Sequence, residues 1–303
     1  MEKLNNVSGE EAEKGKSGSR KRCFRWIDLA IILVFLLGLC ILLYPQASDY
    51  INRIRVAKNI GDYQRNVKEI SPEDYSVILA KARDYNRRLK NNPHPFGSSK
   101  RTEGYQDTLV VGMNGIMGYV MIEKIRVRLP FYHGTEENVL QRAIGHLEGS
   151  SLPIGDKGEH AVLSAHRGLP SAKLFTDLPE LEIGDSFVVT VLDKEMVYEV
   201  DQILTVLPDS PEAVEALKPV PGRDLVTLMT CTPYGVNTHR LLVRGHRTGD
   251  LVHPEDVNGS GDGGKNGINF DRYIPYFAGA AVVIFLLLWF VPVRKKKNGG
   301  GEG

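Results

Sequence analysis

The sequence predicts a mainly β domain, closed into a barrel, that follows a helical region and is flanked by two transmembrane helices. Seven or more segments between residues 119 and 243 have the β-branched content and two-residue alternation of strands, without regular helix–strand alternation. One nearly continuous apolar run lies near each end of the chain. A net charge of +1 and an ordinary globular composition give no reason to expect nucleic acid as a partner.

The two apolar runs predict membrane spans at residues 26–45 and 275–293. A helix of about 19 residues rises roughly 1.5 Å per residue and nearly crosses a hydrocarbon core of about 30 Å. Basic residues precede the first run and directly follow the second, so both chain ends are expected in the cytoplasm and the middle of the chain outside the cell. A buried core helix is the alternative for each run, and the paired basic flanks disfavour it.

A cleaved signal is a second alternative for the first run. Its Leu-Gly-Leu-Cys segment at 37–40 resembles a lipoprotein cleavage box, but Leu39 stands where a small residue is needed. No clean small-x-small site follows, so we expect an uncleaved anchor, with trimming near residues 47–48 left open.

The region between the spans begins with helices and continues with strands. Residues 48–66 and 71–89 have helical apolar periodicity, and Ser71 followed by Pro72 is a strong helix start. Short helices are expected at 136–142 and 211–217. Strands are expected at 119–122, 125–129, 160–165, 186–192, 196–204, 225–230 and 241–243.

The segment from Thr227 to Arg240 is the strongest candidate for chemistry. Two predicted strands flank a loop with proline, glycine and asparagine, so Cys231 ends one strand and Arg240 opens the next. If these strands pair as a hairpin, the two Cβ atoms lie about 5 Å apart. A thiolate attacking an amide builds negative charge on the carbonyl oxygen, which a fixed arginine can stabilise. The alternative is a small buried hydrophobic residue and an ordinary strand-end charge.

The cysteine count favours a functional thiol. Cys23 and Cys40 fall in the cytoplasmic tail and the first span, so Cys231 is the only cysteine of the exported domain. That domain cannot form an internal disulfide, and a lone exported thiol is a liability unless it is buried or used.

A nucleophilic cysteine also needs a base or acid, and the chain has eight histidines. His166 is the best candidate, because it directly follows a predicted strand and precedes a turn. His146 is the runner-up, while His239 and His246 lie close to Arg240 in the sequence. No close metal-ligand spacing and no phosphate-binding motif is present, so neither a metal nor another cofactor is expected.

These segments resemble the sortases, the Gram-positive transpeptidases that join surface proteins to the cell wall or to one another. The Thr-Leu-Met-Thr-Cys sequence at 227–231, with Arg240 nine residues on, is similar to the family's Thr-Leu-x-Thr-Cys…Arg signature. Segments 145–153 and 162–175 resemble the pilin-polymerising class, class C, and the similarity covers roughly residues 70–250. A second span behind a basic stop is also typical of that class.

The resemblance implies an eight-stranded sortase β-barrel and an active site of Cys231, His166 and Arg240. Cys231 would attack the Thr–Gly carbonyl of a Leu-Pro-x-Thr-Gly-like (LPXTG-like) sorting signal, and a lysine amine of a pilin subunit would resolve the thioacyl enzyme. His166 could protonate the leaving amine, Arg240 could stabilise the oxyanion, and Thr230 would help shape the site. The expected partners are the membrane and pilins or surface proteins that carry such signals.

Class C sortases carry a lid with an Asp-Pro-aromatic motif over the active site, and this chain departs from that motif. The matching residues are His94, Pro95 and Phe96, so a histidine replaces the carboxylate. We expect Phe96 to cover Cys231 in a lid held by apolar contact and backbone stiffness, more weakly than with the carboxylate. The alternative is a proline-rich turn that only ends a helix.

The resemblance leaves two alternatives open, an enzyme that attaches surface proteins to a cell-wall precursor and a catalytically silent ectodomain that binds peptide. The expected organisation is the same for each. In chain order it comprises a cytoplasmic tail (1–25), a span (26–45), an extracellular helical region with the lid (46–107), the barrel (108–250), a flexible tether (251–274), a second span (275–293) and a second cytoplasmic tail (294–303).

Overall fold

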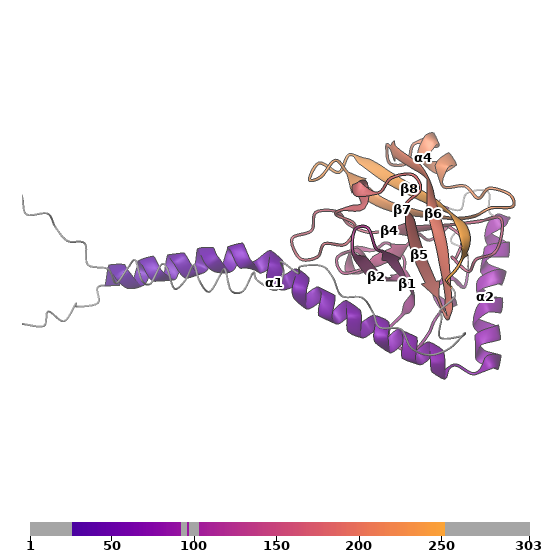
Figure 1. Cartoon of the computed structure of the whole chain (residues 1–303), viewed down its shortest axis with the longest axis horizontal. Helices are drawn as coiled ribbons and strands as arrows, with labels where there is room; N and C mark the ends of the chain where they lie inside the picture. The colour runs from indigo at the N-terminus through magenta and orange to yellow at the C-terminus, as the bar shows by residue number, and fades with distance from the viewer. Residues whose placement is uncertain (1–25, 92–95, 97–102, 252–303) are drawn as a thin grey trace, which may run out of the picture. The chain divides into compact units, whose positions relative to one another are not determined.

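The computed structural model describes residues 26–91, 96 and 103–251. The second predicted span, both predicted tails, and His94 and Pro95 of the predicted lid lie outside these residues. Within the described residues, eight strands close into one barrel beside two long helices (Figure 1). The closed barrel confirms the barrel part of the predicted fold class, and the described residues contain the first of the two predicted spans.

The long helices are α1 (Trp26–Glu69) and α2 (Pro72–Lys90). The sequence predicted a span followed by a separate helix, whereas the structure continues one helix, α1, through Pro45, and α1 changes direction near its middle (Figure 1). α1 is the one helix in the described part of the chain that is long and apolar enough to cross a membrane. α2 begins as predicted, with the Ser71 side chain accepting a 3.1 Å hydrogen bond from the Asp74 amide.

The barrel follows the spatial order β1-β2-β3-β4-β7-β8-β6-β5, with parallel pairs at β2–β3 and β4–β7 and antiparallel pairs elsewhere. The short helices α3 (Glu137–Leu140) and α4 (Pro211–Ala216) lie where they were expected, and 3-10 turns cover Tyr105–Asp107 and Leu178–Glu180. The strands are β1 (Ile116–Ile122), β2 (Val127–His133), β3 (Ile144–His146), β4 (Glu159–Ser164), β5 (Ser186–Val191), β6 (Lys194–Val206), β7 (Asp224–Thr232) and β8 (His239–Asp250).

Apolar side chains form a main core and a smaller cluster on the outer face of four barrel strands. Side chains alternate along a strand, so Leu228 belongs to the main core while its neighbour Met229 belongs to the smaller cluster. Cys231 lies two residues after Met229 and therefore shares the outer face. This outer-face cluster consists of Phe96, Leu147, Val162, Leu204, Val206, Ala213, Ala216, Leu217, Met229 and Leu242.

Candidate active site

Cys231 and Arg240 are direct cross-strand partners at the loop end of the β7–β8 hairpin. This is the pairing that their spacing predicted. Asn237, in the left-handed region with φ of 60°, turns the loop so that its carbonyl accepts a 3.2 Å hydrogen bond from Arg240 Nη1. Nη1 also donates to the carbonyl of His239, at 3.2 Å. Within the described residues the other two guanidinium nitrogens make no hydrogen bond, so they can receive a negatively charged oxygen beside the half-buried thiol.

His166 lies on the other side of Cys231, at the end of β4. β4 runs parallel to β7 with Ser164 opposite Met229. Continuing this register by two residues places His166 beside Cys231. The thiol is therefore on the middle strand, between a histidine on one neighbouring strand end and an arginine on the other. The sheet topology brings together three residues that the sequence separates by up to 74 positions, from 166 to 240.

Thr230 fixes the spacing between these two strand ends. Its buried hydroxyl donates a 2.8 Å hydrogen bond to the carbonyl of Ala165, the residue before His166. The Ala165 amide in turn donates to the Met229 carbonyl at 3.1 Å. The two bonds tie the backbone just before the histidine to the backbone just before the cysteine, so Thr230 positions the pair.

Glu137 contacts His166 and was missed by the sequence reasoning. Its Oε2 atom lies 3.2 Å from His166 Nε2, and its Oε1 atom accepts a 3.1 Å hydrogen bond from the side chain of Gln141. Hydrogen bonds from Gln141 and His166 lower the pKa of the Glu137 carboxyl, which is therefore ionised at neutral pH. With Nε2 occupied, His166 keeps Nδ1 for the thiol or the substrate. No local sequence signal could have shown this contact, because it depends on how α3 packs against the barrel.

His146, the runner-up for the catalytic histidine, is a structural residue. It is fully buried, with Nδ1 2.9 Å from the Tyr105 hydroxyl and Nε2 2.8 Å from the Ser151 carbonyl. Burial lowers the pKa of His146 to about 4, so the ring is neutral and closed to substrate. His246 pairs with Leu225 at the far end of the hairpin.

Among the described contacts, the His239 side chain makes one hydrogen bond, between its Nδ1 atom and the hydroxyl of its neighbour Thr238, at 2.9 Å. It stands opposite Thr232 on β7, one position beyond the pair of Cys231 and Arg240. Among the described residues, no group of three histidine, cysteine or acidic side chains is placed to hold a metal ion. The three side chains at the neighbouring strand ends supply a thiol, an imidazole and a guanidinium.

Phe96 lies on the outer face of the barrel and is partly buried against the outer-face cluster. Its companions there include Met229 and Leu242, each two residues from one of the strand partners Cys231 and Arg240. Phe96 therefore covers the apolar surface that continues from the thiol. The lid role of Phe96 stays a prediction.

The fold and this arrangement define a class of protein. Residues 120–248 match the model of the sortase domain. The crystal structure of sortase C1 from Streptococcus agalactiae is 48% identical in sequence, with a TM-score of 0.56, over 63% of this chain and 98% of that chain. The chain therefore belongs to the sortase family of cysteine transpeptidases.

Within the family, this chain is similar to solved sortases C of streptococci. The structure of Streptococcus pneumoniae sortase C, which was described for its catalysis and pilin substrate specificity, is 37% identical, with a TM-score of 0.57, over 65% of this chain and 100% of that chain. Sortase A of Bacillus anthracis is 31% identical over 45% of this chain. The match spans only 60% of the length of that curated relative.

Proposed function

We propose that this protein is a membrane-anchored transpeptidase that cuts an LPXTG-like sorting signal between Thr and Gly and transfers it to a lysine amine of a pilin. The placement of Cys231 between His166 and Arg240 carries the proposal. The pilin acceptor is supported by the likeness to streptococcal sortases C, one of which was described for pilin substrate specificity. We assign Cys231 as nucleophile, His166 as acid and base, and Arg240 as oxyanion donor, with Thr230 and Glu137 as positioning residues.

The first step forms the thioacyl enzyme. The Cys231 thiolate attacks the carbonyl carbon of the threonine, a C–S bond forms, and negative charge develops on the oxygen beside the free nitrogens of Arg240. The C–N bond to glycine then breaks as His166 gives its proton to the leaving amine. The Glu137 carboxylate, 3.2 Å from His166 Nε2, orients the ring for this step.

The second step resolves the thioacyl enzyme. A neutral lysine amine attacks the thioester carbon, a C–N bond forms, and the C–S bond breaks with its electron pair returning to Cys231. His166 takes the proton that the amine loses and is again ready to protonate a leaving group. The products are an isopeptide bond and the original thiolate with its imidazolium partner.

We also infer that the apolar half of α1 anchors the enzyme, with the barrel on the extracellular face and both chain ends in the cytoplasm. The length and hydropathy of α1 support the first anchor. The apolar run at 275–293, followed at once by four basic residues at 294–297, supports a second anchor.

Intact mass of the full-length protein in detergent tests the proposed reaction. After incubation with an LPXTG-like peptide, we expect an acyl adduct that peptide mapping assigns to Cys231, with Cys23 and Cys40 as internal controls. A lysine-containing peptide should then remove the adduct and yield an isopeptide product. Resolution only by a cell-wall precursor amine would instead identify the acceptor of a cell-wall sortase. A folded protein without any adduct would contradict the transpeptidase proposal.

Phe96→Ala is expected to increase the alkylation rate of Cys231 about tenfold. A partly buried ring contributes on the order of 1.5 kcal/mol of apolar contact to the closed lid. Removing the ring therefore lowers the ratio of closed to open lid about tenfold. The rate of iodoacetamide labelling of Cys231 measures this ratio. Met113→Ala, which removes a fully exposed apolar side chain outside the outer-face cluster, is the matched control. Equal rates for wild type and both variants would show that Phe96 is not a lid.

A further inference from the structure

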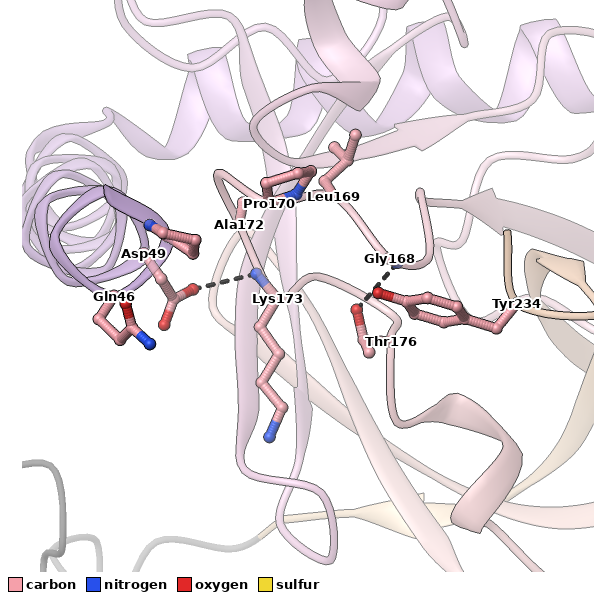
Figure 2. Close-up of a pocket in the computed structure, with 10 residues that line it drawn as sticks. Gln46, Asp49, Gly168, Leu169, Pro170, Ala172, Lys173, Thr176 and Tyr234 are labelled. Carbon is pink, nitrogen blue, oxygen red and sulfur yellow. Dashed lines mark hydrogen bonds between the residues drawn. The ribbon is translucent and has the colours of Figure 1, made fainter. Parts of the chain in front are cut away.

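A cleft of about 450 Å³ lies between α1 and two loops of the barrel, and both loops begin close in sequence to a proposed catalytic residue (Figure 2). One wall comes from the α1 residues Gln46 and Asp49. The opposite side comes from the loop that begins at Gly168, two residues after His166, and from Tyr234, three residues after Cys231. The cleft is therefore attached, through short stretches of chain, to both the thiol and the imidazole.

We propose that this cleft receives the lysine side chain of the acceptor protein; the assignment rests on the transpeptidase function proposed above. The attacking amine must give a proton to His166, and the leaving amine must take one from it, so both groups pass on the histidine side of Cys231. The loop that lines the cleft from Gly168 onwards directly continues from His166. The apolar surface under Phe96 lies on the outer face of the barrel and remains for the sorting signal.

The chemistry of the cleft fits a lysine that is about to attack. Its walls include Pro170 and Ala172, which suit a four-carbon stem. Its two charged groups are already paired, Asp49 with Arg53 and Lys173 with Asp177. A cleft without a spare charge does not hold the amine as ammonium, and the neutral amine is the nucleophile.

Tyr234 gives the cleft a fixed aromatic wall. Its side chain is 59% exposed, yet the Arg167 guanidinium carbon lies 5.8 Å from the ring centroid. The ring also packs directly on Gly168, where an added Cβ would lie 2.7 Å from a ring carbon, so glycine is required there. Because Arg167 and Gly168 already hold one face of the ring in place, the exposed tyrosine loses little conformational entropy when it binds a partner. Such tyrosines are typical of binding hot spots.

The α1 wall is held against the barrel in the same way. The Lys173 amide donates a 3.0 Å hydrogen bond to Asp49 Oδ1, and the Ser48 hydroxyl donates a 3.2 Å hydrogen bond to the Ser171 carbonyl (Figure 2 shows the first). The cleft is thus preformed rather than assembled by its ligand. This part of α1 directly follows the apolar run, so the cleft opens where a membrane-held acceptor would arrive.

The test compares two acceptors on the full-length protein in detergent, after loading with an LPXTG-like peptide. Hydroxylamine is too small to need the cleft, whereas a peptide with a single lysine must place its side chain there. Gln46→Trp narrows the cleft from an exposed helix position, and Tyr234→Ala removes the aromatic wall. Ala47→Trp is the matched control, because Ala47 is exposed on the same helix and does not line the cleft.

We expect the ratio of lysine-peptide turnover to hydroxylamine turnover to fall about tenfold in Gln46→Trp and Tyr234→Ala, through a higher KM for the lysine peptide. Ala47→Trp should keep the wild-type ratio. A wild type that forms the thioacyl adduct, with unchanged ratios in both cleft variants, would overturn the cleft assignment alone. A wild type without adduct would overturn the proposed function, and the cleft assignment with it.

Discussion

Arg240→Ala is expected to lower kcat/KM for an LPXTG-like peptide by about 100- to 1,000-fold, or about 3–4 kcal/mol of transition-state stabilisation. The reason is that two of its three guanidinium nitrogens are free of hydrogen bonds within the described residues, next to the strand position of Cys231. Steady-state release of the glycine-terminated fragment measures the loss. Arg240→Lys should recover only part of it, because lysine keeps the charge and loses the planar fork.

Iodoacetamide labelling of Cys231 is the control for this variant. Alkylation of sulfur creates no oxyanion, so its rate should change far less than kcat/KM in Arg240→Ala. Equal losses in both assays would assign Arg240 to stabilising the thiolate instead. Activity within about tenfold of wild type would contradict both roles.

Glu159→Gln is expected to stabilise the barrel increasingly as the pH rises. Glu159 is buried, its Oε2 atom has no hydrogen-bond partner in the described part of the chain, and it stands opposite Asp224 on β7. Burial raises the pKa of Glu159 from 4.5 to about 7. Between these values the folded protein keeps a proton that the unfolded chain has lost, so the wild type loses stability as the pH rises from 4.5 to 7.

The full effect of this one carboxyl is about 3 kcal/mol, most of which falls between pH 5 and pH 8. The difference in free energy of unfolding between Glu159→Gln and wild type should therefore grow by about 2–3 kcal/mol from pH 5 to pH 8. Urea denaturation followed by circular dichroism at the two pH values measures it. Glu199→Gln, on an exposed position of β6, should show no such growth, and a pH-independent difference in Glu159→Gln would refute the buried-charge explanation.

The buried histidines act in the opposite direction on the same curve. Burial lowers the pKa values of His146 and His160 from 6.5 to about 4. Between pH 4 and pH 6.5 these two rings are therefore protonated in the unfolded chain and neutral in the folded protein. Their contribution is lost as the pH falls from 6.5 towards 4. Two histidines raise the stability as the pH rises towards 6.5, and the single Glu159 lowers it between pH 4.5 and pH 7. The two effects balance near pH 6.5, where the wild type should be most stable.

The sequence predicted most of the fold because most strands are long enough to show two-residue alternation. β3 was missed as a separate strand, since Ile144–His146 has three residues with a glycine in the middle and no measurable period. The merging of two predicted helices into α1 could not be foreseen either, because an interior proline kinks or breaks a helix and the sequence does not show which of the two occurs at Pro45. The parallel pairing of β4 with β7 depends on the whole barrel and has no local signal.

The site was predictable where it depends on one hairpin. Cys231 and Arg240 are nine residues apart and lie opposite each other once the two strands pair as a hairpin around their loop. His166 and His146 both stand at strand ends in the sequence, and only burial separates the accessible ring from the structural one. Glu137 and the α1 wall of the cleft come from distant segments, so tertiary packing alone reveals them.

The unbroken course of α1 has a consequence for which substrates the enzyme can process. One continuous helix, which changes direction near its middle (Figure 1) and contains Pro45, leads from the apolar segment to Ser48 and Asp49, and these two residues hydrogen-bond to the loop that follows His166. If the apolar part of α1 anchors the enzyme as proposed, these contacts limit how far the thiol can lie from the bilayer. A substrate still embedded in the membrane then reaches Cys231 only if the chain between its scissile bond and its own apolar segment has a matching length. Linker length would thus select substrates alongside their sequence.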